Sequence, residues 1–194
     1  MAGVPGAGKT EFAEHLAEEA NNNFIIIEHD KLVEYIDGYK PEDYYNYRKA
    51  GSTLVSEIFK ECVNNRYSFL LDTTLSHKTS QRNIKKCLNG GYLVVVLYLL
   101  QDAEIAWELT EARKLDKRRF IKRAGFEKTC IMINRNLKEI FDAHKTEPNF
   151  MFVAIDKRGE IGVTDAKTVL HSSQSPNIKG IEKILQTKYN IGKG

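Results

Sequence analysis

An eight-residue segment near the N-terminus, Gly3 to Thr10, reads G-V-P-G-A-G-K-T. It matches G-x-x-x-x-G-K-[ST], the loop that holds the phosphates of nucleoside triphosphates in enzymes. Its glycines let consecutive backbone N–H groups turn toward one anion, Lys9 reaches the β- and γ-phosphates, and the Thr10 hydroxyl ligates Mg²⁺. A turn that only joins a strand to a helix needs neither Lys9 nor Thr10. The segment therefore predicts binding of ATP and Mg²⁺ by Gly3, Val4, Pro5, Gly6, Ala7, Gly8, Lys9 and Thr10.

A helical pattern follows this loop directly, with apolar residues at Phe12, Ala13, Leu16, Ala17 and Ala20. The loop is thus expected to open a helix whose positive N-terminus faces the phosphates. A loop of this kind normally follows a buried strand, but only Met1 and Ala2 precede Gly3. We therefore expect the first strand to be missing from the sequence and the natural protein to begin upstream of Met1.

Apolar runs alternate with helical patterns along the rest of the chain. The runs predict strands at 24–27, 67–71, 92–100, 150–155 and 161–163. Helices are expected at 31–36, 52–63, 81–88, 102–118, 127–143 and 177–189, and 37–49 is expected to be a Tyr-rich connection. This alternation predicts an α/β P-loop fold, a mostly parallel sheet with helices on both faces. We expect one domain over 1–194, with a core at 1–163 and a C-terminal loop and helix at 164–194.

Composition excludes several classes of protein. The formal net charge of +3, from 29 basic and 26 acidic residues, is too small to indicate nucleic-acid or membrane binding. No apolar run approaches the length that crosses a bilayer, and no signal peptide is apparent. The three cysteines show no metal-ligand spacing and are typical of reduced, buried thiols in a cytoplasmic protein.

Two acids follow predicted strands and are candidates for chemistry. Asp30 ends the strand at 24–27 and is interpreted as the base for an attacking hydroxyl, as a Mg²⁺ ligand through water, or as a helix N-cap. Asp72 follows Y-S-F-L-L. It is interpreted as a Mg²⁺ ligand through water, as a partner of substrate hydroxyls, or as part of a strand-ending turn. The carboxyl ends of parallel strands form the ligand-binding edge of such sheets, so both acids are expected beside the phosphate loop.

Arginines are the second candidate group. Phosphoryl transfer spreads negative charge over oxygens that guanidinium groups can bind, and Arg113 and Arg119 lie in or beside the basic stretch 114–123. Arg118 and Arg123 are alternatives, and the stretch as a whole is either a solvated helix face or an anion clamp.

Several segments together resemble the zeta toxin family of P-loop kinases, the toxins of bacterial toxin–antitoxin pairs. The resemblance covers residues 1 to about 163 and rests on six segments: G-V-P-G-A-G-K-T, F-I-I-I-E-H-D-K-L, Y-S-F-L-L-D-T-T, G-Y-L-V-V-V-L-Y-L-L, E-A-R…R-R-F-I-K and V-A-I-D-K-R-G. It implies that Lys9 binds phosphate, Asp30 is the base, Arg113 and Arg119 stabilise the transition state, and Asp72 and Thr74 contact the substrate. It also implies an antitoxin partner and a nucleotide-sugar acceptor such as UDP-N-acetylglucosamine.

The chain departs from the family pattern at two of these places. Asp72-Thr73-Thr74 stands where the family usually has Glu-Gly-Thr, and Ile121 and Lys122 stand where a proline usually follows the second arginine. A helix acid of the family would fall near Ser56 or Glu57. The leading hypothesis is a small-molecule kinase. The alternatives are a nucleoside or polynucleotide-end kinase and a catalytically impaired ATP-binding module.

Overall fold

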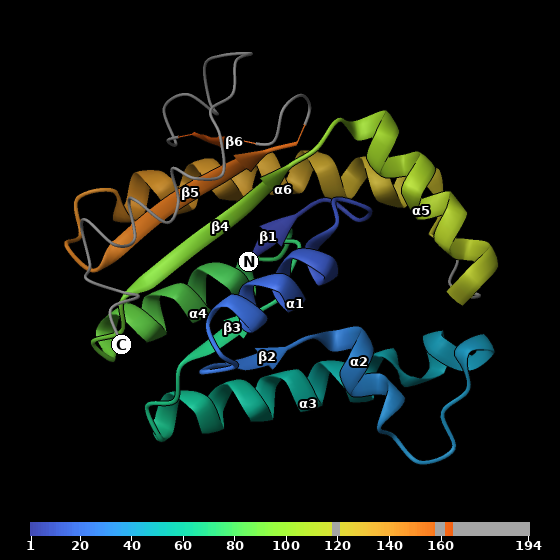
Figure 1. Ribbon diagram of the computed structural model, residues 1–194, viewed down its shortest axis with the longest axis horizontal. Coiled ribbons are helices and arrows are strands. Elements are labelled where there is room, and N and C mark those ends of the chain that lie inside the picture. The colour runs from blue at the N-terminus through green and yellow to red at the C-terminus, as the bar shows by residue number, and fades with distance from the viewer. Residues whose placement is uncertain (118–120, 158–161, 165–194) are drawn as a thin grey trace.

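The structure, a computed structural model, describes residues 1–117, 121–157 and 162–164 (Figure 1). The strands are β1 (Ala2–Gly3), β2 (Ile25–Ile27), β3 (Phe69–Leu71), β4 (Val94–Leu100), β5 (Phe150–Asp156) and β6 (Gly162–Thr164). The helices are α1 (Lys9–Glu19), α2 (His29–Glu34), α3 (Tyr44–Asn64), α4 (Lys78–Asn89), α5 (Ala103–Lys117) and α6 (Arg123–His144), and a 3-10 turn, Pro41–Asp43, precedes α3.

The strands form a mostly parallel sheet. β2 pairs with β3, β4 pairs with β1 and β5, all in parallel, and only β6 among the described strands runs antiparallel, along β5. The backbone of Met1 joins the two ladders, because its nitrogen donates to Leu71 O at 2.8 Å and its carbonyl accepts from Thr73 N at 3.2 Å. The order across the molecule is therefore β2-β3-β1-β4-β5-β6, which confirms the predicted α/β fold.

The strand that feeds the phosphate loop is very short. β1 has two residues, and Ala2 and Gly3 are in register with Tyr98 and Leu99 of β4. It lies between β3 and β4, so the prediction that this strand is missing was wrong. A two-residue strand stands where the sequence suggested that none was present, and it leads directly into the loop.

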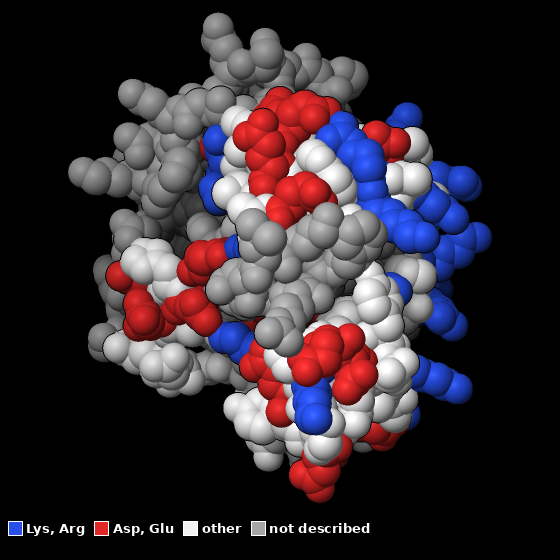
Figure 2. All heavy atoms as spheres, turned by 90° about the vertical axis from the view of Figure 1, so that its right-hand side faces the viewer, with Lys and Arg blue, Asp and Glu red and all other residues white. Residues whose placement is uncertain are grey.

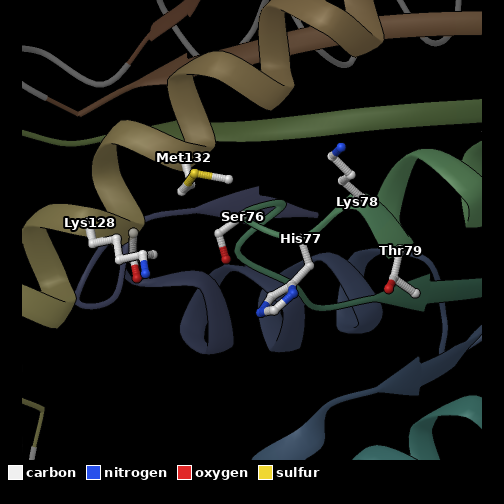
Figure 3. A pocket seen from close by; sticks show the side chains of 7 residues that line it. Ser76, His77, Lys78, Thr79, Lys128 and Met132 are labelled. Atoms are coloured by element: carbon white, nitrogen blue, oxygen red, sulfur yellow. The ribbon is translucent and has the colours of Figure 1, made fainter.

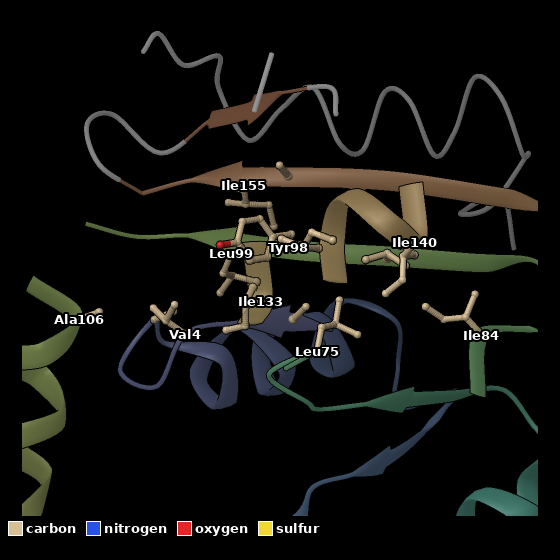
Figure 4. Packing of buried hydrophobic residues seen from close by; sticks show 14 of the residues in the cluster. Val4, Leu75, Ile84, Tyr98, Leu99, Ala106, Ile133, Ile140 and Ile155 are labelled. Carbon is tan, nitrogen blue, oxygen red and sulfur yellow. The ribbon is translucent and has the colours of Figure 1, made fainter. Parts of the chain in front are cut away.

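Two apolar clusters hold the helices against the sheet. The larger one joins β1, β4 and β5 to helices α1, α4, α5 and α6, and it includes Leu99, Ile133 and Ile155 (Figure 4). The smaller one packs Phe59 and Cys62 of α3 against Ile27 of β2. The three cysteines are free thiols. None of the helices in the described ranges is long and apolar enough to cross a membrane.

Four of the predicted helices, α2, α3, α4 and α6, begin earlier than expected. α3 begins at Tyr44 and not at Ser52, so the second part of the connection expected at 37–49, from Tyr44 on, is the first part of a 21-residue helix. Polar residues and Gly51 interrupt the apolar pattern there, although Tyr44 is buried. α2 begins at His29, which places Asp30 in its first turn. The helix expected at 177–189 lies outside the described residues.

Candidate functional site

The segment Gly3 to Gly8 forms a tight loop between β1 and α1. Ala7 N donates to Val4 O at 3.1 Å, and Phe12 N donates to Gly8 O at 3.2 Å, so the loop closes on itself and continues into the helix. Gly8 is the N-cap residue and has φ 77°, a left-handed conformation that favours glycine. No side chain caps α1. Its first-turn N–H groups therefore remain available for an anion.

Lys157, at the end of β5, lies across this loop and was missed in the sequence. Its ammonium donates to Ala7 O at 3.0 Å, and a Cβ placed on Gly8 would stand 2.6 Å from that nitrogen. Its backbone N–H donates to Leu100 O at 2.8 Å, which fixes the chain at the carboxyl edge of the sheet. The available signals were its position two residues after a predicted strand and its place in the segment V-A-I-D-K-R-G. Lys157 adds positive charge beside the phosphate loop.

Lys9 and Thr10 connect the loop to acidic groups. The Lys9 ammonium donates to Val4 O at 3.2 Å, and the Thr10 hydroxyl donates to Glu28 Oε1 at 3.0 Å. Glu28 is buried, and burial raises the pKa of its carboxyl. The hydrogen bond from Thr10 opposes this rise, and the Asp72 carboxylate adds a smaller contribution to it. Glu28 was not predicted as a site residue, because strand alternation alone does not show which of the side chains that follow the strand faces the loop.

Asp30 is held by two neighbouring rings. The Tyr44 hydroxyl donates to Asp30 Oδ1 at 2.9 Å, and His29 Nδ1 lies 3.3 Å from the same oxygen. The interpretation of Asp30 as a helix N-cap was wrong, because Glu28 occupies the N-cap position of α2. The carboxylate keeps about two fifths of its surface accessible, with a side-chain exposure of 39 %. It is thus oriented by a buried tyrosine and open to a ligand.

The pairing of Asp30 with Tyr44 depends on close packing of α2 against α3. A Cβ at Gly51 of α3 would lie 2.3 Å from Val33 Cγ2 and 3.0 Å from His29 Nε2, so only glycine permits this approach. His29 Nε2 also lies 3.0 Å from Arg48 O, on the same helix. α3 therefore fixes the first turn of α2, where Asp30 lies.

Asp72 directly follows β3 and is largely buried. Its backbone N–H donates to Ile27 O at 2.9 Å, which places it beside the end of β2. Its Oδ1 is buried without a hydrogen-bond partner among the described residues. Burial raises the pKa of this carboxyl, and the nearby Lys9 ammonium opposes that rise. A buried, unsatisfied hydrogen-bond acceptor beside Lys9 is suited to a ligand that brings a hydroxyl or a cation.

Thr74 lies in a loop that α6 holds in place. Its hydroxyl is 2.7 Å from the Ser76 hydroxyl. Leu75, between them, is buried with φ 56°, an uncommon conformation for a branched side chain, and the buried Asn136 amide donates to Leu75 O at 2.7 Å. Asn136 thus satisfies the carbonyl of a strained residue and fixes the course of the loop that carries Asp72 and Thr74.

The arginines occupy separate places. Arg113 of α5 pairs with Glu11 in the first turn of α1, so its guanidinium lies next to the helix that the phosphate loop opens. Arg123 pairs with Glu104 at 2.6 Å and lies 5.1 Å from the Trp107 ring centroid, which joins α6 to α5. Arg123 is therefore engaged in helix packing and is a poor counterpart of the second arginine. Arg118 and Arg119 lie outside the described residues.

Comparison with known proteins now decides the family. The sequence profile described as Zeta toxin matches residues 1–174. The chain belongs to the zeta toxin family. A comparison with curated protein sequences gives no match.

Solved structures support the fold of this zeta toxin family member. A protein of the PezAT chromosomal toxin–antitoxin system of the human pathogen Streptococcus pneumoniae superposes with a TM-score of 0.68 at 17 % identity, over 100 % of this chain and 78 % of that chain. A deoxyadenosine kinase from M. mycoides with bound dATP gives a TM-score of 0.47 at 18 % identity, over 95 % of this chain and 97 % of that chain. At the identity of the first match, the likeness establishes the α/β fold with a mostly parallel sheet.

Charge is unevenly distributed over the edge of this zeta toxin family member where the parallel strands end. That edge lies on the right in Figure 1 and faces the viewer in Figure 2. Acidic side chains lie toward the middle of the view, and Lys and Arg side chains gather along its right-hand margin, on the side of α6. Acidic groups suited to hydroxyls and cations therefore lie beside basic groups suited to phosphates.

Proposed function

We propose that this protein is an ATP-dependent kinase that transfers the γ-phosphoryl group of MgATP to a hydroxyl of a small molecule. The proposed acceptor is a nucleotide sugar such as UDP-N-acetylglucosamine. The observation that carries the proposal is the connection between the loop and the acids. Thr10 donates to Glu28 at 3.0 Å, and the Lys9 ammonium opposes the rise that burial causes in the pKa of Asp72. A loop that only joined a strand to a helix would need neither contact.

The nucleotide is held by the loop. Backbone N–H groups of the segment Gly3 to Thr10 would bind the phosphates, and the ammonium groups of Lys9 and Lys157, which now donate to loop carbonyls at 3.2 and 3.0 Å, would supply countercharge. Mg²⁺ fits beside them, because a hydroxyl and carboxylates are its preferred ligands, and it neutralises charge on the phosphates when bound. Thr10 would hold it directly, and Glu28 and Asp72 are placed to act through water.

Asp30 is proposed as the base. The acceptor hydroxyl oxygen forms a bond to the γ-phosphorus, the bond from that phosphorus to the β-phosphate oxygen breaks, and the hydroxyl proton passes to the Asp30 carboxylate. Tyr44 and His29 orient this carboxylate, at 2.9 and 3.3 Å from Oδ1. The remaining product is ADP.

Arg113 and Arg119 are proposed to stabilise charge on the transferred phosphoryl group. Arg113 pairs with Glu11 in the first turn of α1, one turn from the loop, and exchange of Glu11 for a phosphoryl oxygen would bring its guanidinium to the reaction. Asp72 and Thr74 are proposed to bind acceptor hydroxyls. Their side chains suit hydrogen bonds to a sugar, since Oδ1 of Asp72 has no partner among the described residues.

Membership of the zeta toxin family supports a role as the toxin of a toxin–antitoxin pair, and similarity to a PezAT protein supports an antitoxin partner. Because ATP and nucleotide sugars are found in the cytoplasm, we infer that the protein acts there.

An acceptor screen tests this proposal. The purified protein is incubated with MgATP and a panel of nucleotide sugars, free sugars, nucleosides and 5′-hydroxyl oligonucleotides, and ADP and phosphorylated product are measured together. The proposal requires equal amounts of both with at least one nucleotide sugar. Transfer only to nucleosides or oligonucleotides would replace the proposed acceptor class, and tight ATP binding without any transfer would contradict kinase activity.

A further inference from the structure

The outer sides of helices α4 and α6 are basic. α4 contains no Asp or Glu, and its basic side chains are all exposed: Lys78, Arg82, Lys85 and Lys86. An exposed stripe of α6, with spacings of three and four residues, consists of Lys128, Ile131, Arg135 and Lys138. This concentration of charge is local, because the whole chain has a formal net charge of only +3.

Direct contacts hold the two helices side by side. The Gln81 amide of α4 donates to Glu139 Oε2 of α6 at 2.7 Å, and Arg135 Nε donates to Glu139 Oε1 at 3.0 Å. Lys78 of α4 and Lys128 of α6 line one cavity. The exposed residues therefore form one continuous surface, called here the α4–α6 face, made of Lys78, Arg82, Lys85, Lys128, Ile131, Arg135 and Lys138.

Most of the positive charge on the α4–α6 face has no internal counter-ion. Four of its lysines make no ion pair or hydrogen bond with any described residue: Lys78, Lys85, Lys128 and Lys138. The acids of the second half of α6 are engaged elsewhere, since Glu139 binds Gln81 and Arg135, and Asp142 binds Lys145 at 2.9 Å. Like charges that stay unpaired on one surface repel each other, so the face is complementary to an acidic partner.

Apolar groups lie among these charges at two places. Ile131, in the middle of the α6 stripe, is 69 % exposed. A cavity of about 400 Å³ lies where the first turn of α4 meets the first half of α6, and in Figure 3 Met132 lies between Lys128 and Lys78. The cavity is lined by Ser76, His77, Lys78, Thr79, Lys128, Thr129 and Met132. A partner that carries apolar side chains between acidic ones finds contacts of both kinds here.

This combination favours a protein segment over a nucleic acid. Single-stranded nucleic acids bind where exposed aromatic side chains lie beside basic ones. Among the described residues, the large aromatic side chains that are exposed lie on or just after α2 and α3, and not on α4 or α6: Tyr35, Tyr45 and Tyr67. An exposed isoleucine between basic side chains instead suits an acidic amphipathic helix, which presents apolar and charged groups at the same spacing.

We propose that the α4–α6 face binds an acidic amphipathic segment of a partner protein. Carboxylates of the segment pair with basic side chains of both helices, and its apolar side chains contact Ile131 and Met132. The inference goes beyond the proposed kinase function and does not depend on it, because none of these residues has a role in the proposed transfer reaction.

A designed peptide tests the face directly. The probe is a fluorescein-labelled helical peptide of about 20 residues with Glu and Leu at helical spacing, titrated against the nucleotide-free protein by fluorescence anisotropy. The Kd is expected below about 100 μM at about 0.1 M salt. Lys85→Glu with Lys138→Glu should weaken binding at least about tenfold, and Ile131→Ser at least about threefold. The matched control is Lys49→Glu with Lys60→Glu at exposed positions of α3, which should change the Kd less than about twofold.

A charge-reversed peptide separates lost recognition from lost folding. With Lys in place of each Glu, the peptide should bind the Lys85→Glu, Lys138→Glu protein at least about tenfold more tightly than it binds the wild type. No binding of the acidic peptide to the wild type, or equal affinities of the face variant and the α3 control, would overturn the proposal. Tighter binding of an RNA oligonucleotide or of phosphatidylglycerol vesicles, lost in the same face variant, would also overturn it and assign the face to a nucleic acid or a membrane.

Discussion

The nucleotide side and the acceptor side of the site are built in different ways. On the proposed nucleotide side, eight consecutive residues supply a loop whose backbone would do most of the binding, and Lys157, directly after β5, crosses it. On the acceptor side, the groups come from α2, α3 and the loop after β3, and side-chain contacts such as Tyr44 to Asp30 position them. Backbone recognition is encoded locally, whereas side-chain recognition depends on the tertiary structure.

This difference means that substitutions should have separable effects. Changes on the nucleotide side should weaken ATP binding or the stabilisation of the transferred group, for every acceptor alike. Changes on the acceptor side should leave ATP affinity intact and alter the transfer step or the choice of acceptor.

On the nucleotide side, the largest effect is expected for Arg113→Ala. A guanidinium that stabilises the transferred phosphoryl group contributes about 10³-fold or more to kcat in related reactions, so kcat should fall by about that factor with the Kd for ATP nearly unchanged. Steady-state kinetics and nucleotide titration measure the two quantities. Arg135→Ala, at an exposed position on α6, is the control and should retain full activity. A fall in kcat smaller than about threefold in Arg113→Ala would show that Arg113 does not stabilise the transferred phosphoryl group.

Lys9→Met should weaken the nucleotide side itself. Loss of its ammonium removes countercharge from the β- and γ-phosphates, and kcat/KM for ATP should fall by about 10²-fold or more. Titration with a fluorescent ATP analogue and the transfer assay report binding and turnover. Lys60→Met, on the exposed face of α3, should have no effect. An unchanged affinity for ATP would show that the loop does not bind phosphate through this residue.

Tyr44→Phe should affect only the acceptor side. It removes the hydroxyl that donates to Asp30 at 2.9 Å, so the carboxylate loses its fixed orientation and kcat should fall by about tenfold. The Kd for ATP and the melting temperature in the presence of ATP should change much less than kcat and stay close to the wild-type values. Tyr47→Phe, which keeps its ring contact with Tyr39, is the matched control. Equal kcat in Tyr44→Phe and wild type would show that the hydrogen bond from Tyr44 of α3 is not needed to orient Asp30.

Asp72→Asn should have the smallest effect on the folded protein, and the effect should be stabilising. The raised pKa of Asp72 means that the folded state binds more protons than the unfolded state, so the free energy of unfolding of the wild type falls as pH rises through that pKa. Removing the buried charge should raise stability near pH 7 by about 1 kcal/mol and by less at pH 4.

Urea unfolding of the ligand-free protein at several pH values measures this difference. Asp142→Asn, whose carboxylate pairs with Lys145 at an exposed position, should change stability by less than about 0.5 kcal/mol. A gap between wild type and Asp72→Asn that narrows as pH rises would contradict the assignment of Asp72 as a destabilising buried acid.

The sequence predicted the phosphate loop and the alternation of strands and helices well, for a physical reason. The phosphate loop is contiguous, and long apolar runs such as Val94 to Leu100 form buried parallel strands under almost any arrangement of neighbours. The strand that feeds the loop was expected to be missing, and that prediction was wrong. Ala2 and Gly3 pair with β4, but a strand of two residues leaves no apolar run in the sequence.

The acceptor side was less predictable because its contacts join residues that are distant in sequence. Asp30 meets Tyr44 across 14 positions, and Leu75 of the loop that carries Asp72 meets Asn136 across 61. The N-terminal part of α3 was missed because Gly51 breaks the helical pattern. A larger residue at this position would clash with His29 and Val33 of α2. The residue that weakened the helix prediction is thus the one that lets α2 bring Asp30 into position.

The most direct test of the proposed chemistry is single-turnover transfer by Asp30→Asn. Asparagine preserves size and hydrogen bonding but cannot accept the proton, so the rate of transfer to the identified acceptor should fall by about 10² to 10⁴-fold while the Kd for ATP stays within about twofold of wild type. Both are measured on the same preparation with radiolabelled ATP. Transfer by Asp30→Asn at the wild-type rate would contradict the assignment of Asp30 as the base and, with it, the proposed mechanism.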